Sequence, residues 1–551
     1  MARILTLAEA QALDSRKDGQ LKDWAYNALD TTGTREIADV LLPRLRQLVD
    51  SEGRIIANSE GVYAFERALQ APALAMMLRG VRMDTTKRQQ MVNDLKRELA
   101  KDLRGIAKMP GVEDKWDATE LETGFCTLEM GKHHKWPRGV PDSPDRRCER
   151  CGVPRVKPAA FNPNSSEQAF HLFYDLHGKP PLTNKKGEES TDEDVLERLG
   201  KKYPELLPIT TAILAVRDKK KQLGSLNARL LDGRYPSSFN VGAAWTGRFS
   251  SSKVPFGYGG NLQNVAERHR QAFVPDVGMD MFYSDYMQGE SNIVAHVSGD
   301  EAYIEAHRVG DVHTFATRLI WPHLAWTGDL KKDKAIAKQN PTWDQAPGHD
   351  YRYQAKRIQH GSNFGMSPYG ISMVAHIPLP EARKAYESYF YAFPGIKGWQ
   401  ENIAKKIKNH EPIVNPLGRA ILLTGRPWDD HTRKQGLSFI PQSTLADIED
   451  IALWRVWYEM DDMEEWLLQL LAQVHDALLG QHPSGKLEVV RHMADLMRIP
   501  VPVTDYRGTT RTMTIGVEVA VGKNWGKACS QEEADKGKCR YNPYGMKEIE
   551  L

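Results

Sequence analysis

The stretch MFYSDYMQGESNIVAHVSGD, residues 281–300, decides the fold of this chain. Its apolar start predicts a β-strand that reaches Asp285, and Gln288 and Gly289 then predict a turn. The apolar residues beyond the turn recur on one face of a helix. One carboxylate is therefore expected where a strand ends and a helix follows.

A second carboxylate is expected at the tip of a β-hairpin. The segment WLLQLLAQVHDALLGQHP, residues 466–483, carries two apolar arms on either side of His475 and Asp476. An isolated aspartate at a turn usually only shapes the turn. Two aspartates that meet could instead bind the two Mg²⁺ ions used in phosphoryl transfer, because Mg²⁺ prefers hard oxygen ligands.

A basic helix is expected between these two segments. In RYQAKRIQHGSNFG, residues 352–365, the side chains of Arg352, Lys356, His360 and Phe364 are spaced by four and share one helical stripe. Two cations followed by two rings could hold a triphosphate at one end and a base or sugar at the other. The alternative interpretation is a solvated basic face.

The bulk composition limits the classes of function. The chain has 551 residues, 41% of them hydrophobic, which is enough for several subdomains. Its 74 Lys and Arg residues nearly cancel its 72 Asp and Glu residues, so any basic surface must be local. The sequence has neither a signal peptide nor a stretch approaching the roughly 18 apolar residues of a membrane span, so a cytoplasmic protein without a membrane partner is expected. Five cysteines, an odd number, fit a reducing compartment.

The pattern along the chain predicts an α+β protein with a mainly helical N-terminal half. Helical periodicity is found in residues 35–50, 62–79 and 165–231. From Phe239 onward, short strands and Gly-rich turns alternate with helices. The polar stretch from Lys331 to Tyr351 is expected to be an exposed excursion.

One irregular insertion carries a candidate metal site. Cys148 and Cys151 have the C-x₂-C spacing of a zinc knuckle, and Cys126, His133 and His134 lie in the same insertion. A closed Cys₃His site would use the three cysteines with His134, or with His133 as the alternative ligand, and would be structural. The other interpretation is a loop with free thiols and surface histidines.

These segments, taken together, resemble family A DNA polymerases, the DNA polymerase I group. The match runs in order from about residue 60 to residue 526. Its pieces are TGRFSS at 246–251, NLQNV at 261–265, DYMQGESNIVAHVSGD at 285–300, DVHTFA at 311–316, the helix at 352–365 and QVHDALL at 473–479. Each piece is weak by itself, but the ordered set is specific.

The resemblance implies a right-hand architecture of thumb, palm and fingers, with a mainly helical N-terminal part and an inserted zinc module. The expected divisions are a remnant of a 3′–5′ exonuclease domain at 1–60, the start of the polymerase domain at 61–120, the zinc module at 121–158, the thumb at 159–235, the palm at 236–300 and 411–551, and the fingers at 301–410.

The resemblance also implies a DNA-directed DNA polymerase that extends a primer 3′-OH with dNTPs on a DNA template. Asp285, the Tyr286 carbonyl and Asp476 would bind two Mg²⁺ ions. Arg352 and Lys356 would grip the triphosphate, and Lys356 is expected to donate a proton to the pyrophosphate.

Further residues are assigned roles by the same resemblance. The remaining contacts to the nucleotide would come from Gln288, His360, Phe364 and Glu290, and Glu290 would act as a steric gate against a ribose 2′-hydroxyl. Expected contacts to DNA are Arg248, Asn261, Gln263, Gln442 and His475, with Lys219 and Lys220 of the basic thumb run Arg217–Lys221 holding phosphates.

Three positions depart from the usual family pattern. His360 stands where the family has Phe or Tyr, Phe364 where a Tyr usually closes the site, and Ala477 where a Glu commonly follows the catalytic aspartate. The metal ligands remain, so activity is expected with altered misinsertion or lesion bypass. Reverse transcription is a possible side activity.

The N-terminal segment WAYNALDTTGTREIADVLLPRL, residues 24–45, weakly resembles the last proofreading motif, with Tyr26 and Asp30 in its active positions. The expected proofreading site is incomplete. Two interpretations stay open: a vestige packed on the palm, or a fragment completed by a separate exonuclease chain.

Other functions are considered alongside a polymerase. Glu290 disfavours an RNA polymerase, and a noncatalytic DNA-binding accessory is the alternative from another class. A viral or phage replicative enzyme in the host cytoplasm is the expected type, with a processivity factor as a further possible partner.

Overall fold

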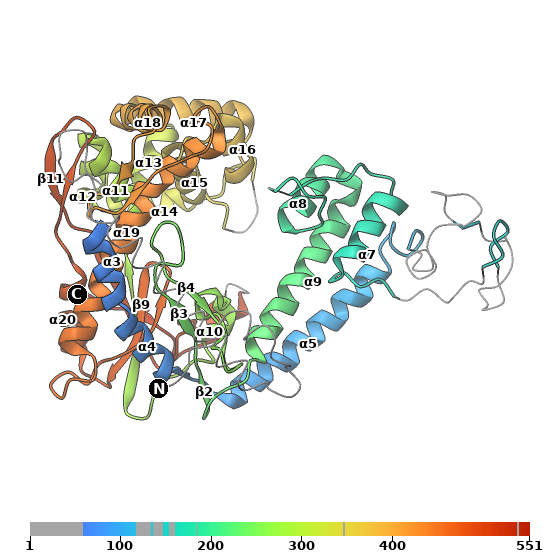
Figure 1. Cartoon of the computed structure of the whole chain (residues 1–551), viewed down its shortest axis with the longest axis horizontal. Coiled ribbons are helices and arrows are strands. Elements are labelled where there is room, and N and C mark those ends of the chain that lie inside the picture. The colour runs from blue at the N-terminus through green and yellow to red at the C-terminus, as the bar shows by residue number, and fades with distance from the viewer. Residues whose placement is uncertain are drawn as a thin grey trace, which may run out of the picture.

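The computed structural model describes residues 59–116, 134–135, 147–153, 160–184, 186–344, 348–536 and 539–551. Within these ranges the chain forms a body built around a β-sheet, a block of helices above it and a helical arm to one side (Figure 1). Among the described helices, none combines the length and apolar character needed to cross a membrane.

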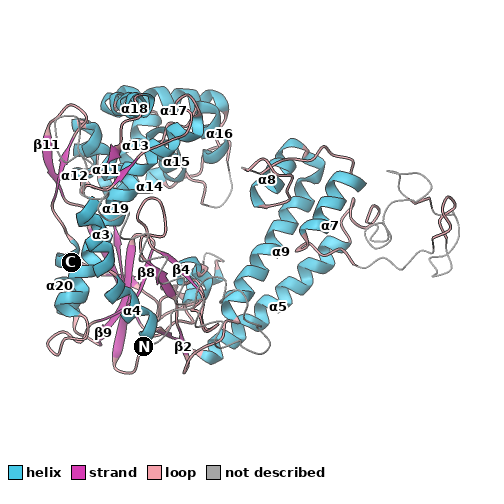
Figure 2. Cartoon of the chain, viewed as in Figure 1, coloured by secondary structure: helices cyan, strands magenta, loops and turns pink. Residues whose placement is uncertain are grey.

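The body contains a five-stranded antiparallel sheet in the order β13-β12-β5-β9-β8 (Figure 2). The strands are β5 (Met279–Tyr286), β8 (Gln469–Val474), β9 (Ala477–Pro483), β12 (Val517–Gly522) and β13 (Lys547–Glu548). The predicted strand before Asp285 and the predicted hairpin around Asp476 are both confirmed. Asp285 lies opposite Ala477 on one side and Glu518 on the other. Directly opposed residues point to the same face, so these three side chains form one row across the sheet.

Helices cover the opposite face of the sheet. The Tyr286 hydroxyl donates a hydrogen bond of 2.8 Å to the Met497 carbonyl at the end of α20 (Leu487–Met497). The long helix α19 (Asp430–Met460) packs against α20 and β8 and includes Pro441. The sheet and these helices share the main hydrophobic core.

The helical block lies above the sheet in Figure 1, and a second core around Trp321 stabilises part of it, between residues 316 and 385. Its helices are α11 (Gly289–Ser298), α12 (Glu301–Val309), α13 (Val312–Ile320), α14 (Leu330–Ala337), α15 (Tyr351–Asn363), α16 (Pro368–Ala375), α17 (Leu379–Ala392) and α18 (Pro394–Lys408). The expectation of an exposed excursion at 331–351 is wrong in part. Most of α14 lies in this stretch, and the Trp343 ring lies 6.4 Å from Trp321 and 5.7 Å from Tyr351, because these aromatic surfaces bury one another.

The arm is built on two long helices, α5 (Thr85–Ala107) and α9 (Leu207–Leu226), which pack along each other. Smaller elements complete it: α7 (Ser166–Phe170), the π-helix η1 (His171–Leu176), α8 (Glu193–Lys202) and the 3₁₀ turn η2 (Pro204–Leu206). A separate core that includes Phe173, Leu199 and Ile213 stabilises the arm. Helix α5 precedes the expected thumb range of 159–235, so the arm uses chain from both sides of the insertion.

The helical structure predicted at residues 62–79 is confirmed, and it forms two helices, α3 (Ser59–Ala68) and α4 (Gln70–Arg79). Pro72 lies in the first turn of α4, where its missing N–H is tolerated. It cannot bond back to the end of α3, so the helix is interrupted there.

Short elements connect these parts. They are β1 (Val81–Arg82), β2 (Arg234–Tyr235), β3 (Ser238–Asn240), β4 (Ser250–Ser252), η3 (Leu262–Asn264), α10 (Glu267–Arg270), β6 (Ile413–Val414), β7 (Ala420–Ile421), β10 (Val501–Thr504), β11 (Thr510–Met513) and α21 (Gln531–Asp535). Cys529 and Cys539, which the sequence leaves unassigned, form a disulfide that closes a local loop.

Arg419 joins the N-terminal helix α3 to α19. Its Nη1 donates to Glu66 at 2.6 Å, and its Nε and Nη2 donate to Asp447 Oδ1 at 2.9 and 2.8 Å. The Asp447 side chain is only 7% exposed. Removing one member of a buried ion pair leaves an uncompensated charge.

We predict that Arg419→Met lowers the free energy of unfolding by about 3 kcal/mol, because it leaves Asp447 buried and unpaired. Arg308→Met breaks an exposed pair with Glu305 and should cost less than about 0.5 kcal/mol. Urea unfolding followed by far-ultraviolet circular dichroism measures both. Equal costs for the two variants would contradict the assignment.

Candidate active site

Asp285 lies near the C-terminal end of β5, at the rim of the sheet. Burial and, after it, the nearby Asp476 carboxylate raise the pKa of Asp285 to about 7. The two predicted aspartates therefore come together, although 190 residues separate them in the sequence. The backbone N–H of Tyr286 points to the Asp476 carbonyl at 3.4 Å, so the two segments also meet through the main chain.

Asp476 lies in the two-residue turn between β8 and β9. His475, the other turn residue, has a left-handed backbone with φ of 61°, which non-glycine residues adopt only where the surroundings hold it. The Gln473 side chain donates a 2.7 Å hydrogen bond to the His475 carbonyl. The tip of the hairpin is thus fixed from within.

Arg248 neutralises part of this acidic cluster. Its Nη2 donates to Asp476 Oδ1 and to Glu290 Oε1, both at 2.9 Å. Glu290 lies in the first turn of α11, and burial raises its pKa although Arg248 opposes this. From the sequence, Arg248 is expected to contact DNA and Glu290 the nucleotide sugar. The structure brings both beside Asp476.

The stripe expected at residues 352–365 is present on α15. Arg352 forms a two-pronged ion pair with Asp311, in which Nε and Nη2 donate at 2.8 and 2.9 Å. Burial raises the pKa of Asp311, but the hydrogen bonds and charge of Arg352 outweigh it and hold the pKa at about 2. Lys356 is exposed, and its charge lowers the pKa of Asp285.

Three more residues are expected to contact the nucleotide, namely Gln288, His360 and Phe364. The His360 and Phe364 rings meet edge to face with their centres 4.6 Å apart. Gln288 precedes α11 in a left-handed conformation with φ of 54°. The turn predicted at Gln288 and Gly289 is confirmed.

The residues expected to contact DNA differ in exposure and in hydrogen bonding. His475 is exposed and Gln442 is half-buried on α19. Gln263 is buried, and its Nε2 donates to Gln473 Oε1 at 2.6 Å. Asn261 accepts hydrogen bonds from the Ser251 hydroxyl and the Asn264 backbone. These last two amides hold the local fold.

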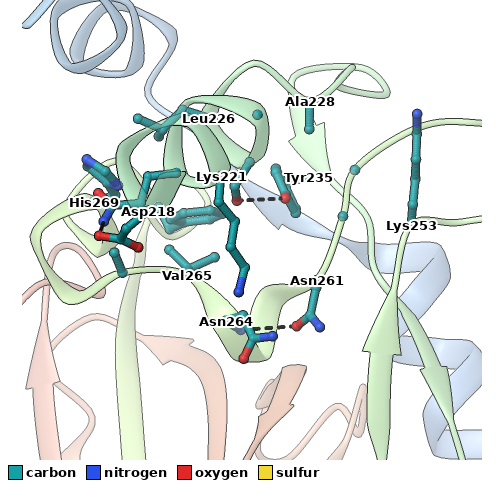
Figure 3. Close-up of a pocket in the computed structure, with 17 residues that line it drawn as sticks. Asp218, Lys221, Leu226, Ala228, Tyr235, Lys253, Asn261, Asn264, Val265 and His269 are labelled. Atoms are coloured by element: carbon teal, nitrogen blue, oxygen red, sulfur yellow. Dashed lines mark hydrogen bonds between the residues drawn. The ribbon is translucent and has the colours of Figure 1, made fainter. Parts of the chain in front are cut away.

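The basic run Arg217–Lys221 of the arm contains both internally bonded and exposed side chains. Arg217 donates to two backbone carbonyls inside the arm, and Lys219 pairs with Asp102 of α5 at 2.5 Å. Lys220 and Lys221 are exposed. Figure 3 shows Lys221 extending toward Asn264 in a cavity of about 380 Å³ where α9 meets η3.

Three functional candidates carry no clear signal in the sequence. Asp311 opens the DVHTFA piece, but its pairing with Arg352 depends on the packing of α13 against α15. Gln473 of β8 donates to the His475 carbonyl at the hairpin tip, and Glu449 is buried on α19. Burial and then the Asp476 and Asp450 carboxylates raise the pKa of Glu449 well above its usual range.

The structure brings three of the candidate zinc ligands close together. His134, Cys148 and Cys151 have their ligand atoms within 4.8 Å of one another. Burial raises the pKa of Cys148, but backbone N–H groups of Cys151 and Arg150 outweigh this and hold it at about 6, which favours the thiolate that binds metal. The other candidate ligands, Cys126 and His133, lie outside the described residues, as do Tyr26 and Asp30.

Comparison with known proteins identifies the family. The family model for DNA polymerase family A matches residues 153–527, the range that contains both aspartates and the α15 stripe. The chain belongs to DNA polymerase family A. The family expected from the ordered motifs is therefore confirmed.

Two relatives illustrate the extent of this family A match. The thermostable DNA polymerase I of Thermus aquaticus is 28% identical over 386 residues, covering 66% of this chain and 42% of that protein. DNA polymerase I of Geobacillus stearothermophilus is 29% identical over 380 residues, covering 64% and 40%. The chain thus spans about two fifths of the length of these relatives.

A solved structure shares the fold. It is the POL domain of Pol1 from M. smegmatis in complex with DNA primer-template and dNTP, with a TM-score of 0.58 at 24% identity, covering 83% of this chain and 70% of that chain. The expected right-hand architecture is confirmed. We call the body, the helical block and the arm palm, fingers and thumb.

We predict that Asp311→Asn lowers the free energy of unfolding by about 2 kcal/mol. The pKa of this carboxyl group falls from about 3.9 in the unfolded chain to about 2 in the folded protein, and the ionised group therefore stabilises the fold by about this amount. The contribution is fully present above about pH 5 and is lost as the pH falls through 2. Urea unfolding from pH 3 to pH 8 measures it.

Asp311→Ala is the matched control for this charge. Asp311 also caps α13, a role that Asn can fill and Ala cannot, so Ala should cost about 1 kcal/mol more. If wild type and Asp311→Asn have the same free energy of unfolding at pH 7, the ion-pair assignment is wrong.

Proposed function

We propose that this chain is a template-directed DNA polymerase that extends a primer 3′-OH with dNTPs by two-metal nucleotidyl transfer. The observation that carries the proposal is the meeting of Asp285 and Asp476 at the palm rim within a family A fold. The related POL domain whose title names DNA primer-template and dNTP supports the same partners.

The acidic cluster fits divalent metal ions. Burial and then repulsion from Asp476 raise the pKa of Asp285, and a cation between the two carboxylates would relieve the repulsion. We propose Asp285, the Tyr286 carbonyl and Asp476 as oxygen ligands for Mg²⁺. Bound Mg²⁺ would activate the attacking 3′-oxygen and stabilise the leaving oxygen.

The incoming nucleotide would lie between α15 and the palm rim. The Asp311 pair uses Nε and Nη2 of Arg352, so Nη1 is the donor proposed for a phosphate. Lys356 would contact the triphosphate and protonate the leaving pyrophosphate. Gln288 and Glu290 would line the sugar side, with Glu290 held in place by Arg248. His360 and Phe364 would form the ring wall and give it unusual selectivity.

Primer and template would follow the palm into the thumb. The proposed contacts are Arg248, Gln442 and the exposed His475 near the site, then the exposed Lys220 of the thumb. Lys219 and Asn261 would reach DNA only beside the internal bonds that they already make. Gln263, which is buried, would act through Gln473. Phosphate contacts of this kind give affinity without reading sequence.

A noncatalytic DNA-binding accessory remains the second candidate because of two observations. Arg248 already donates a hydrogen bond to the Asp476 carboxylate, and Ala477 lacks the carboxylate common at that position in the family. An extension assay separates the two functions.

We predict that the purified chain extends a DNA primer on a DNA template with dNTPs and Mg²⁺. Asp476→Ala should lower the extension rate about a thousandfold, because a lost metal ligand removes several kcal/mol of transition-state stabilisation. Asp495→Ala, an exposed aspartate of α20, is the control and should keep the wild-type rate. Extension that survives Asp476→Ala would refute the mechanism, and an inert wild type would favour the accessory.

We propose a structural Zn²⁺ site in the insertion, held by Cys148, Cys151, His134 and a fourth ligand, for which Cys126 is the candidate. The clustering of the three described ligands and the lowered pKa of Cys148 support it. Such a site orders a loop that has little apolar content of its own.

We predict about one equivalent of zinc in the purified chain, lost in Cys148→Ser. Cys529→Ser, which breaks the distant disulfide, is the matched control and should retain the zinc. Inductively coupled plasma mass spectrometry measures the metal, and less than about half an equivalent in wild type would argue against the site.

A further inference from the structure

One side of α15 is buried in the fingers and carries two amide side chains. Gln359 and Asn363 are spaced by four, so they lie one above the other on the helix, and they are only 1% and 2% exposed. Each comes directly before a ring of the stripe, His360 and Phe364. Consecutive residues lie about 100° apart around a helix, so the amides and the rings occupy neighbouring faces. Contacts that hold the two amides therefore also fix the two rings.

The Tyr303 hydroxyl of α12 accepts hydrogen bonds from both amides. Gln359 Nε2 donates to it at 2.7 Å, and Asn363 Nδ2 donates at 3.1 Å. The Tyr303 side chain is fully buried, so water does not compete for these bonds. Its ring packs against Phe393 with the ring centres 4.6 Å apart. One well-packed hydroxyl group thus binds two successive turns of α15.

The oxygen of each amide also has a buried partner. Gln359 Oε1 accepts from His313 Nδ1 of α13 at 2.6 Å, and Asn363 Oδ1 accepts from the Tyr389 hydroxyl of α17 at 2.8 Å. An amide oxygen can only accept, so these contacts fix which end of each amide faces Tyr303. A buried network with both ends of each amide bonded specifies one arrangement of its helices.

The two ends of α15 are held by different means. At its start, Arg352 forms the partly exposed ion pair with Asp311. At its end, Gln400 Nε2 of α18 donates to the Ser362 and Asn363 carbonyls at 2.7 and 3.0 Å, where intrahelical donors run out. The ring end of the helix is therefore held by buried hydrogen bonds rather than by charge.

We propose that Tyr303 is a positioning residue that sets the place of the His360 and Phe364 rings through Gln359 and Asn363. The inference rests on the proposed polymerase function for its consequence at the nucleotide. Under that function the two rings contact the incoming dNTP, whereas the proposed metal ligands lie in the palm. A displaced ring wall therefore weakens dNTP binding and leaves the chemical step nearly unchanged.

The test is Tyr303→Phe, which removes one oxygen atom and keeps the ring contacts. Tyr174→Phe is the matched control, because Tyr174 is a buried tyrosine of the thumb whose hydroxyl donates to the Ser190 carbonyl at 2.9 Å. The first readout is hydrogen exchange of the peptide 356–366, which needs no catalysis. The second is single-turnover primer extension, which separates the KM for dNTP from the rate at saturating dNTP.

Tyr303→Phe should speed exchange of the peptide 356–366 about tenfold, because two buried amide N–H groups lose their acceptor. It should raise the KM for dNTP about tenfold and keep the saturating rate within about threefold. Tyr174→Phe should leave all three quantities unchanged. Unchanged exchange in Tyr303→Phe overturns the proposal, as does an equal rise of the KM in Tyr174→Phe.

Asn363→Leu tests the link between Tyr303 and the helix. It removes one of the two amides through which Tyr303 acts, so part of the effect of Tyr303→Phe is already present in this variant. The KM of the double variant should fall at least about threefold short of the product of the two single effects. Effects that multiply fully would show that Tyr303 acts by another route, and the proposal is then rejected.

The two readouts keep this proposal separate from the proposed function. If wild type fails to extend primers, the polymerase function falls, while hydrogen exchange still decides whether Tyr303 holds α15. If exchange responds but the KM for dNTP does not, Tyr303 stabilises the helix without positioning the rings, and the proposal is rejected.

Discussion

The pairing of β5 with β9 is the constraint on which the candidate site depends. It sets Asp285 opposite Ala477, one residue beyond Asp476, and so brings two carboxylates to one rim of the palm. A slip of one residue would turn Asp285 into the helix-covered core, because strand side chains alternate between faces. The Tyr286 hydroxyl bond to Met497 on that covered face holds the register.

Bringing carboxylates together has an electrostatic cost that the surrounding structure manages. Arg248 bridges Asp476 and Glu290. Burial and then repulsion from Asp476 raise the pKa values of Asp285 and Glu449. A bound cation would therefore stabilise this cluster of carboxylates. A site of this kind is less stable by itself than an apolar core, and the large packed palm around it supplies the stability.

Internal ion pairs also determine how many basic side chains face solvent. Arg352 is held by Asp311, Lys219 by Asp102 and Arg419 by Glu66 and Asp447, so many cations of this nearly neutral chain serve internal contacts. Runs of Lys and Arg in the sequence therefore overstate the basic surface. The exposed Lys220 and Lys221 are what remains of the expected basic strip in the described thumb.

The sequence by itself determined the strand at Asp285, the hairpin at Asp476, the stripe on α15 and the family, since these follow from local periodicity and from motifs in a fixed order. It misjudged part of the stretch 331–351, where aromatic packing decides. It did not locate the helix break near Pro72, where a missing N–H decides. Only the tertiary structure placed Arg248 on Asp476, Asp311 on Arg352 and Gln263 on Gln473. These pairs join residues from separate elements, and no local pattern specifies which charges will share a buried space.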